Sequence, residues 1–110
     1  MTRLIQISTT VDTRRKAKEI ANTLAMKRLV ACVQILGPIQ SVYRWNGKIE
    51  HSKEWLCLVK AREEDYGSIE TTIKRMHPRE VPEILAVPVL RRNRDYLNWV
   101  RKETTRRPNS

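Results

Sequence analysis

An imidazole and two carboxylates lie close together in residues 77–84, between a helical pattern and an apolar strand pattern. Both prolines of this segment fix φ and remove a backbone donor, and each disfavours helical conformation in the residue before it. The segment is therefore predicted to be a stiff connector that holds His77, Glu80 and Glu83 in a defined arrangement. A plain helix-to-strand joint with solvated charges explains the same residues, since charged loops are common.

Metal binding has little support from the residues themselves. His51 and His77 are the only histidines, and neither a CxxC nor an HxxxH spacing occurs, although such spacings are typical of metal sites. The sequence predicts, at most, weak binding in which His77 shares a metal with Glu80 or Glu83. In the competing interpretation, His77 ends a helix and interacts favourably with its dipole.

Catalysis is not expected. The three glycines, Gly37, Gly47 and Gly67, form no G-x-G or GK[ST] phosphate loop. Cys32 lies inside a predicted strand with no histidine nearby in the sequence, which argues against a Cys-His nucleophile. The chain is therefore interpreted as a binding protein that requires no cofactor.

The two cysteines are predicted to be reduced core residues. If Asn46-Gly47 forms a two-residue turn, Cys32 and Cys57 lie four residues out of register on paired strands. Their sulfur atoms are then roughly 13 Å apart, too far for a disulfide. Both lie in apolar runs, where free cysteine is often buried.

The hydrophobic pattern predicts four strands and three helices. The strands cover residues 4–9, 30–45 with an interruption at Gly37-Pro38, 48–61 and 84–90, where Pro88 suggests an edge or a bulge. The first helix begins just after Asp12 or Thr13, either of which can cap it, and continues at least to Leu24. The other helices cover residues 63–76 and 95–102. The order β-α-β-β-α-β predicts an α+β, ferredoxin-like sandwich with a short C-terminal helix. Residues 1–103 form one domain, and residues 104–110 form a polar, basic tail that is expected to fray.

The long central hairpin predicts self-association. Asn46-Gly47 between β-forming residues is the strongest short hairpin signal. Arms of 13–15 residues would extend roughly 45–50 Å, whereas a domain of this size has a radius of gyration of about 13 Å. The hairpin must therefore project beyond the core, where its apolar side chains and free edges need cover from another chain.

Charge and hydropathy restrict the partners. The chain has 110 residues and a formal net charge of +10, which attracts polyanions without specificity. The first predicted strand has no aromatic residue, and the apolar run of the third has only Trp55. The aromatic pattern of an RNA-recognition sheet is therefore not met, and nucleic acid is expected to bind only unspecifically. No apolar run approaches the roughly 18 residues of a membrane span, and the polar N-terminus is not a signal peptide. A cytoplasmic protein without a membrane partner is expected.

Four separated motifs together resemble one known family. They are, in order, Ala31-Cys32-Val33, residues 41–50, residues 77–84 and Tyr96-Leu97-Asn98-Trp99. This arrangement resembles CutA, the divalent-cation tolerance family of small trimeric proteins related to PII signalling proteins. The resemblance extends from about Ile5 to Val100. It implies a homotrimer in which hairpins of neighbouring subunits extend each other's sheets.

The resemblance also implies a small-ligand site in clefts between subunits, where the base of one hairpin meets the neighbour's connector. The positions that match family motifs are Tyr43, Trp45, Lys60, His77, Glu80 and Glu83. Arg79 replaces a usual tyrosine and Arg92 a usual glycine; both add positive charge, which favours a small anionic ligand.

A metal role is weakened at two positions. Ser8 and Met76 stand where some members of the CutA family carry a cysteine and a second histidine. Of the two, only Met76 retains an affinity for copper(I). The expected function is thus that of a non-enzymatic trimer associated with divalent-cation tolerance, with weak copper binding; the alternative is a basic module that binds polyanions.

Overall fold

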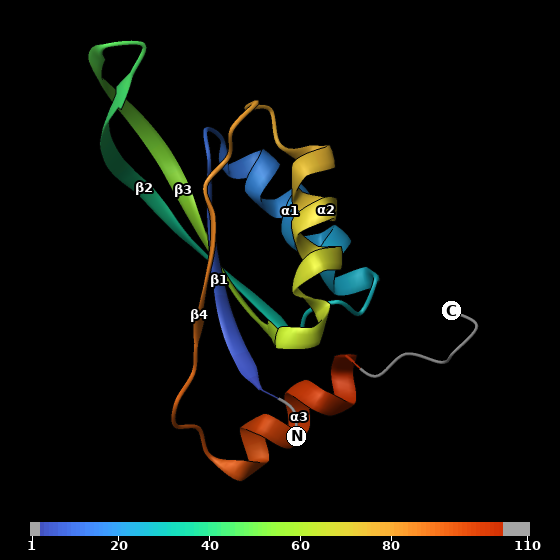
Figure 1. Cartoon of the computed structure of the whole chain (residues 1–110). Helices are drawn as coiled ribbons and strands as arrows, with labels where there is room; N and C mark the ends of the chain where they lie inside the picture. The colour runs from blue at the N-terminus through green and yellow to red at the C-terminus, as the bar shows by residue number, and fades with distance from the viewer. Residues whose placement is uncertain (1–2, 105–110) are drawn as a thin grey trace.

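The computed structural model describes residues 3–104. Its elements are β1 (Leu4–Val11), α1 (Arg14–Met26), β2 (Cys32–Trp45), β3 (Lys48–Arg62), the short 3-10 helix η1 (Glu63–Asp65), α2 (Tyr66–Met76), β4 (Ile84–Pro88) and α3 (Arg94–Thr104). The strands form one antiparallel sheet in the order β2-β3-β1-β4, and α1 and α2 cover the same face (Figure 1). The predicted ferredoxin-like α+β fold is confirmed.

The core lies between the sheet and the two helices. Ile7 of β1 is paired with Val59 of β3, and both are fully buried together with Ile20 of α1 and Ile73 of α2. Because side chains alternate along a strand, the intervening residues of β1 and β3 point to the other face of the sheet. This second face is not covered by α1 or α2 (Figure 1).

The turn of the long hairpin is as predicted. Asn46 has a φ of 51° and Gly47 a φ of 77°, which is the combination that a type I′ turn requires. The pairing continues regularly from Trp45 and Lys48 down to Ile39 and Glu54. The hairpin extends beyond the rest of the molecule (Figure 1).

A bulge interrupts this pairing without dividing β2. Gly37 and Pro38 lie opposite the single residue Trp55, and the register shifts by one between Leu36 and Ile39. A Cβ atom at Gly37 would collide with the indole ring of Trp55, so this position accepts only glycine without rearrangement. The predicted interruption is therefore a β-bulge inside one continuous strand.

Because of the bulge, the two cysteines are placed differently from the prediction. Cys32 is opposite Lys60, and Cys57 is opposite Ile35, so the cysteines are three residues out of register rather than four. Cys57 is fully buried against the helices, but Cys32 is only half-buried and points to the other face, because an odd number of residues separates their positions. Both thiols are free, as predicted, but Cys32 is not a core residue.

Several boundaries also differ from the prediction. β1 continues to Val11, two residues beyond the predicted end, and β4 ends at Pro88 rather than residue 90. β4 is an edge strand, a position that tolerates proline. The acidic residues before α2 form η1, and the helix itself begins at Tyr66. Among residues 3–104, no helix has the length and hydrophobicity needed to span a membrane.

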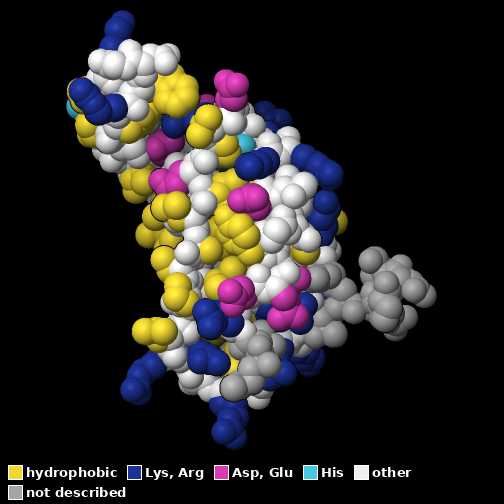
Figure 2. All heavy atoms as spheres, viewed as in Figure 1, with side chains coloured by type: hydrophobic (Ala, Val, Ile, Leu, Met, Phe, Trp, Pro, Cys, Tyr) yellow, Lys and Arg dark blue, Asp and Glu magenta, His cyan; other side chains and the backbone are white. Residues whose placement is uncertain are grey.

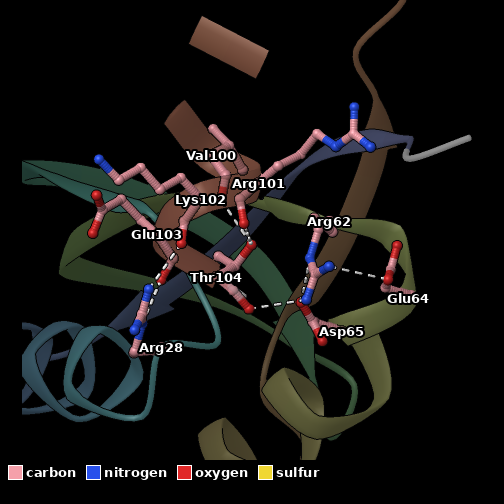
Figure 3. A network of polar contacts seen from close by, with 9 residues as sticks. All are labelled: Arg28, Arg62, Glu64, Asp65, Val100, Arg101, Lys102, Glu103 and Thr104. Atoms are coloured by element: carbon pink, nitrogen blue, oxygen red, sulfur yellow. Dashed lines mark hydrogen bonds and ion pairs between the residues drawn. The ribbon is translucent and has the colours of Figure 1, made fainter. Parts of the chain in front are cut away.

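Two arginines hold the C-terminal end of α3 (Figure 3). Arg28 donates from Nε to the carbonyl oxygen of Glu103 at 2.9 Å and from Nη2 to that of Lys102 at 2.8 Å. Arg62 donates to the carbonyl oxygen of Thr104 at 2.9 Å. These donors satisfy carbonyl groups that a helix end leaves without intrahelical partners.

The C-terminal tail begins later than predicted, because Thr104 belongs to α3. It is the last residue of α3, it is buried, and its hydroxyl donates to the carbonyl oxygen of Val100 at 2.7 Å. The remainder of the predicted tail, residues 105–110, lies outside the described residues.

Candidate functional site

A cleft of about 700 Å³ lies between the hairpin and the connector that joins α2 to β4. We call it the hairpin–connector cleft. It is lined by Thr10, Ser41, Val42, Tyr43, Trp45, Glu54, Arg79, Glu80, Val81, Pro82 and Glu83. Figure 2 shows hydrophobic and acidic side chains gathered where the hairpin meets the body of the molecule.

Five of the predicted ligand-binding residues line this cleft: Tyr43, Trp45, Arg79, Glu80 and Glu83. The CutA resemblance implied walls from two subunits, whereas here the hairpin and the connector of one chain form the cleft together. The two prolines of residues 77–84 restrict the connector that faces the hairpin.

The centre of the cleft is an ion pair between its two walls. Arg79 Nη2 lies 3.1 Å from Glu54 Oε2, and the guanidinium carbon of Arg79 lies 5.5 Å from the centre of the Tyr43 ring. The Glu54 side chain is almost completely buried. Its Oε2 atom has no well-aligned hydrogen bond among residues 3–104, so the contact with Arg79 is ionic without being a directed hydrogen bond.

The predicted metal ligand His77 has a structural role in this chain. The backbone N–H of Arg79 donates to Nδ1 of His77 at 3.0 Å, so Nδ1 carries no proton. Nε2 lies 2.7 Å from the carbonyl oxygen of Thr10, and because a carbonyl only accepts, Nε2 carries the proton and donates. Both ring nitrogens are therefore engaged within the chain, so neither is free to coordinate a metal.

His77 also ends α2, although not through the expected dipole contact. Its φ and ψ are −77° and 133°, and its N–H donates to the carbonyl oxygen of Ile73 at 2.8 Å. The ring turns away from the helix and fastens the connector to the end of β1. Among residues 3–104, no group of three or more His, Cys, Asp or Glu side chains is arranged to hold a metal ion.

The remaining carboxylates lie on the outer part of the cleft. Glu80 and Glu83 are exposed. The hydroxyl of Ser8 is 3.5 Å from Glu83 Oε2, at the limit of a hydrogen bond. Ser8 thus contacts the connector at the position where a cysteine was expected from the family pattern, and Met76 packs against the core.

Lys60 and Arg92 lie elsewhere. Lys60 is paired with Gln6 and Cys32 in the sheet, and its Nζ donates to Gln34 Oε1 at 2.9 Å. Arg92 follows β4, and its guanidinium is 3.4 Å from the carbonyl oxygen of Leu90. Neither residue lines the hairpin–connector cleft.

Glu54 is the residue that the sequence did not reveal. Its ion-pair partner Arg79 is 25 positions away in the sequence, and no local pattern distinguishes a buried glutamate from a solvated one. One signal was available: the replacement of a family-typical tyrosine by Arg79 adds a cation that requires a counter-charge.

The comparison with known families is consistent along almost the whole chain. Residues 5–103 match the family model described as "CutA1 divalent ion tolerance protein". The "Divalent-cation tolerance protein CutA" of Thermus thermophilus is 40% identical over 95 residues, which are 86% of this chain and 92% of that protein. Human "Protein CutA" is also 40% identical over 95 residues, but these cover only 53% of its length. The chain thus spans about half of the mammalian relative.

Solved structures agree with the sequence comparison. The crystal structure of CutA1 from Oryza sativa superposes with a TM-score of 0.91 at 33% sequence identity, and the match covers 94% of each chain.

Proposed function

Because the chain belongs to the CutA1 divalent ion tolerance family, we propose that it is a non-enzymatic, trimeric binding protein of the response to divalent cations in the cytoplasm. The observation that carries the binding role is the hairpin–connector cleft, which is lined by three carboxylates and one guanidinium in a chain of net charge +10. Binding is expected to occur there rather than at a histidine-based metal centre.

The charges of the cleft favour a cation. Glu54, Glu80 and Glu83 oppose only Arg79, and Arg79 is already paired with Glu54. The anionic ligand expected from the sequence depended on free positive charge at Arg79 and Arg92. One of these side chains is neutralised and the other lies outside the cleft, which reduces the support for an anion.

Affinity for copper is expected to be weak. Carboxylate oxygens suit hard cations better than copper(I), and the imidazole of His77 is engaged at both nitrogens. Weak, exchangeable binding of a divalent cation at Glu80 and Glu83 is therefore the metal activity that we propose. No further cofactor is required.

Trimer formation is supported by exposed apolar side chains on β4 and by the projecting hairpin. Leu85 and Val87 of β4 are 59% and 53% exposed, and Val42 and Ile49 near the hairpin tip are exposed too. Exposed apolar side chains and two free sheet edges are unfavourable in an isolated chain. Packing of three copies would cover both.

A non-enzymatic role agrees with the state of the nucleophilic candidates. Burial raises the pKa of the Cys57 thiol to about 11, so it remains protonated and unreactive at neutral pH. Cys32 is half-buried and no histidine pairs with it.

Native mass spectrometry of freshly purified protein tests this proposal, because it reports subunit number and bound metal together. We expect a trimer that loses divalent cations readily. Calorimetry with CuCl2 and MgCl2 should give weak binding that the double substitution Glu80→Gln, Glu83→Gln removes and Glu19→Gln leaves unchanged. A monomer, or a tight copper site that depends on His77, would contradict it.

A further inference from the structure

We propose that the hairpin–connector cleft binds a small organic cation, an amine or guanidine carried on an apolar body, with Glu54 as its counter-ion and the Tyr43 ring as its cation–π partner. The inference depends on the proposed role of this cleft as a binding site. It extends that role by assigning the chemical class of the ligand.

The chain itself shows how such a cation is held. The guanidinium of Arg79 lies 3.1 Å from a Glu54 oxygen and 5.5 Å from the centre of the Tyr43 ring. A carboxylate on one side and an aromatic face on the other are the two elements that recognise organic cations. Arg79 therefore occupies the position that we assign to the cationic group of the ligand.

Glu54 is not fully satisfied by this arrangement. Only 3% of the residue is exposed, yet Oε2 receives no well-aligned hydrogen bond from any described residue. A buried carboxylate is stabilised strongly only when directed N–H donors accompany the opposite charge. A ligand ammonium or guanidinium, free of a connecting backbone, can approach Oε2 in the direction that a hydrogen bond requires.

Arg79 can be displaced without loosening the connector. Its side chain is 35% exposed, so its guanidinium can move into solvent. Its backbone N–H stays fixed to His77 Nδ1, and His77 in turn is fixed to Thr10. The exchange replaces one cation beside Glu54 by another, so the buried carboxylate keeps a counter-charge throughout.

The apolar walls distinguish an organic cation from a metal ion. Trp45 is 48% exposed, and it lines the cleft with Val81 and Pro82. A hydrated metal ion would gain nothing from these surfaces, whereas an apolar body attached to the cation would bury them.

Matched probes test the ligand class. Calorimetry in about 0.15 M salt, where screening acts beyond about 8 Å, should compare benzylguanidine, benzyl alcohol and benzoate on the native protein. We expect saturable binding of benzylguanidine at one site per chain, and at least about tenfold weaker binding of the other two, a factor equal to ~1.4 kcal/mol. Glu54→Gln should abolish it, and Glu19→Gln, a remote carboxylate control, should not. Preference for benzoate, or benzylguanidine binding that survives Glu54→Gln, would overturn the proposal.

Chemical rescue provides a second test that does not depend on Glu54→Gln being well folded. Arg79→Ala leaves a buried carboxylate without its cation and should lower Tm. Benzylguanidine should restore most of that loss, and its stabilising effect should exceed the effect on the native protein because no side chain competes. The double variant Arg79→Ala, Glu54→Gln should show no rescue. If benzylguanidine raises the Tm of both variants equally, Glu54 is not the counter-ion.

The outcome is separate from that of the proposed function. A trimer that binds divalent cations but not benzylguanidine would overturn this inference alone. A monomer that binds benzylguanidine through Glu54 would support the ligand class and contradict the trimer.

Discussion

The Nε2 atom of His77 lies 2.7 Å from the carbonyl oxygen of Thr10, which joins the connector after α2 to the end of β1. Because of this contact, His77 stabilises the position of the connector, and its Nε2 atom is not available as a metal ligand. It keeps Arg79, two residues further on, facing Glu54.

Replacement of this histidine should therefore affect stability more than metal binding. His77→Ala leaves the Thr10 carbonyl and the Arg79 N–H without their partner, and we expect a loss of about 1–3 kcal/mol in the free energy of unfolding. Urea unfolding measures this, with the exposed His51→Ala as a control within about 0.5 kcal/mol of the native protein. Copper affinity by calorimetry should hardly change; abolition of a sub-micromolar site would contradict our assignment.

The turn of the hairpin should control assembly. Replacement of Asn46-Gly47 by two valines puts β-branched residues where both φ angles are positive, so the type I′ turn becomes strained. We expect a weaker trimer and a lower Tm, measured by light scattering and thermal unfolding. Asn46→Asp is the matched control because Asp-Gly forms the same turn; a folded, native-like monomer of the unmodified chain would disprove the dependence of the fold on assembly.

Two glycines should respond to alanine substitution in opposite ways. Gly37→Ala forces a methyl group against the Trp55 ring, and we expect a loss of about 1–3 kcal/mol in unfolding free energy. Gly67→Ala, in the first turn of α2, meets no atom within 4 Å and should stabilise the protein by up to about 1 kcal/mol through helix propensity. Denaturant unfolding of both variants compares them directly; a stabilising Gly37→Ala would show that Trp55 moves freely.

The burial of Cys57 should lower the free energy of unfolding at alkaline pH. Burial raises its pKa from the usual 9.0 to about 11, so between these values the folded chain binds a proton that the unfolded chain has released. The stability that this group contributes is complete below pH 9 and falls as the pH rises toward 11, by about 1.4 kcal/mol per pH unit. Unfolding curves of the native protein and of Cys57→Val between pH 8 and pH 11 should diverge by this slope; parallel curves would exclude the thiol as the cause.

The positive charge should produce salt-sensitive binding of polyanions. Arg91, Arg92 and Arg94 are all exposed just before and at the start of α3. We expect elution from heparin to move to lower salt when all three are replaced by glutamine, and the dependence of affinity on salt to become less steep, since each phosphate contact contributes about 0.7–0.9 to that slope. Preference for one nucleic-acid sequence would favour a dedicated nucleic-acid site instead.

Local chemistry determined much of the fold from the sequence. Asn46-Gly47 specified the turn because few residue pairs adopt two positive φ angles. Asp12 or Thr13 was predicted to cap α1, and the cap is Thr13, whose hydroxyl accepts from the N–H of Lys16 at 3.1 Å. Pro88 indicated an edge strand or a bulge because it cannot donate to a neighbour, and β4 is an edge strand. In each case the residue and its structural effect lie within a few positions of each other.

Only the tertiary structure decided the composition of the site. The bulge at Gly37-Pro38 shifts the register of the lower hairpin by one residue and thereby turns Cys32 away from the core. Lys60 was predicted to belong to the same site as the cleft residues, but its side chain points from β3 toward Gln34. The pairing of Glu54 with Arg79 depends on the position where the sheet brings the hairpin beside the connector. Burial and pairing across such sequence distances follow from packing, which no local pattern encodes.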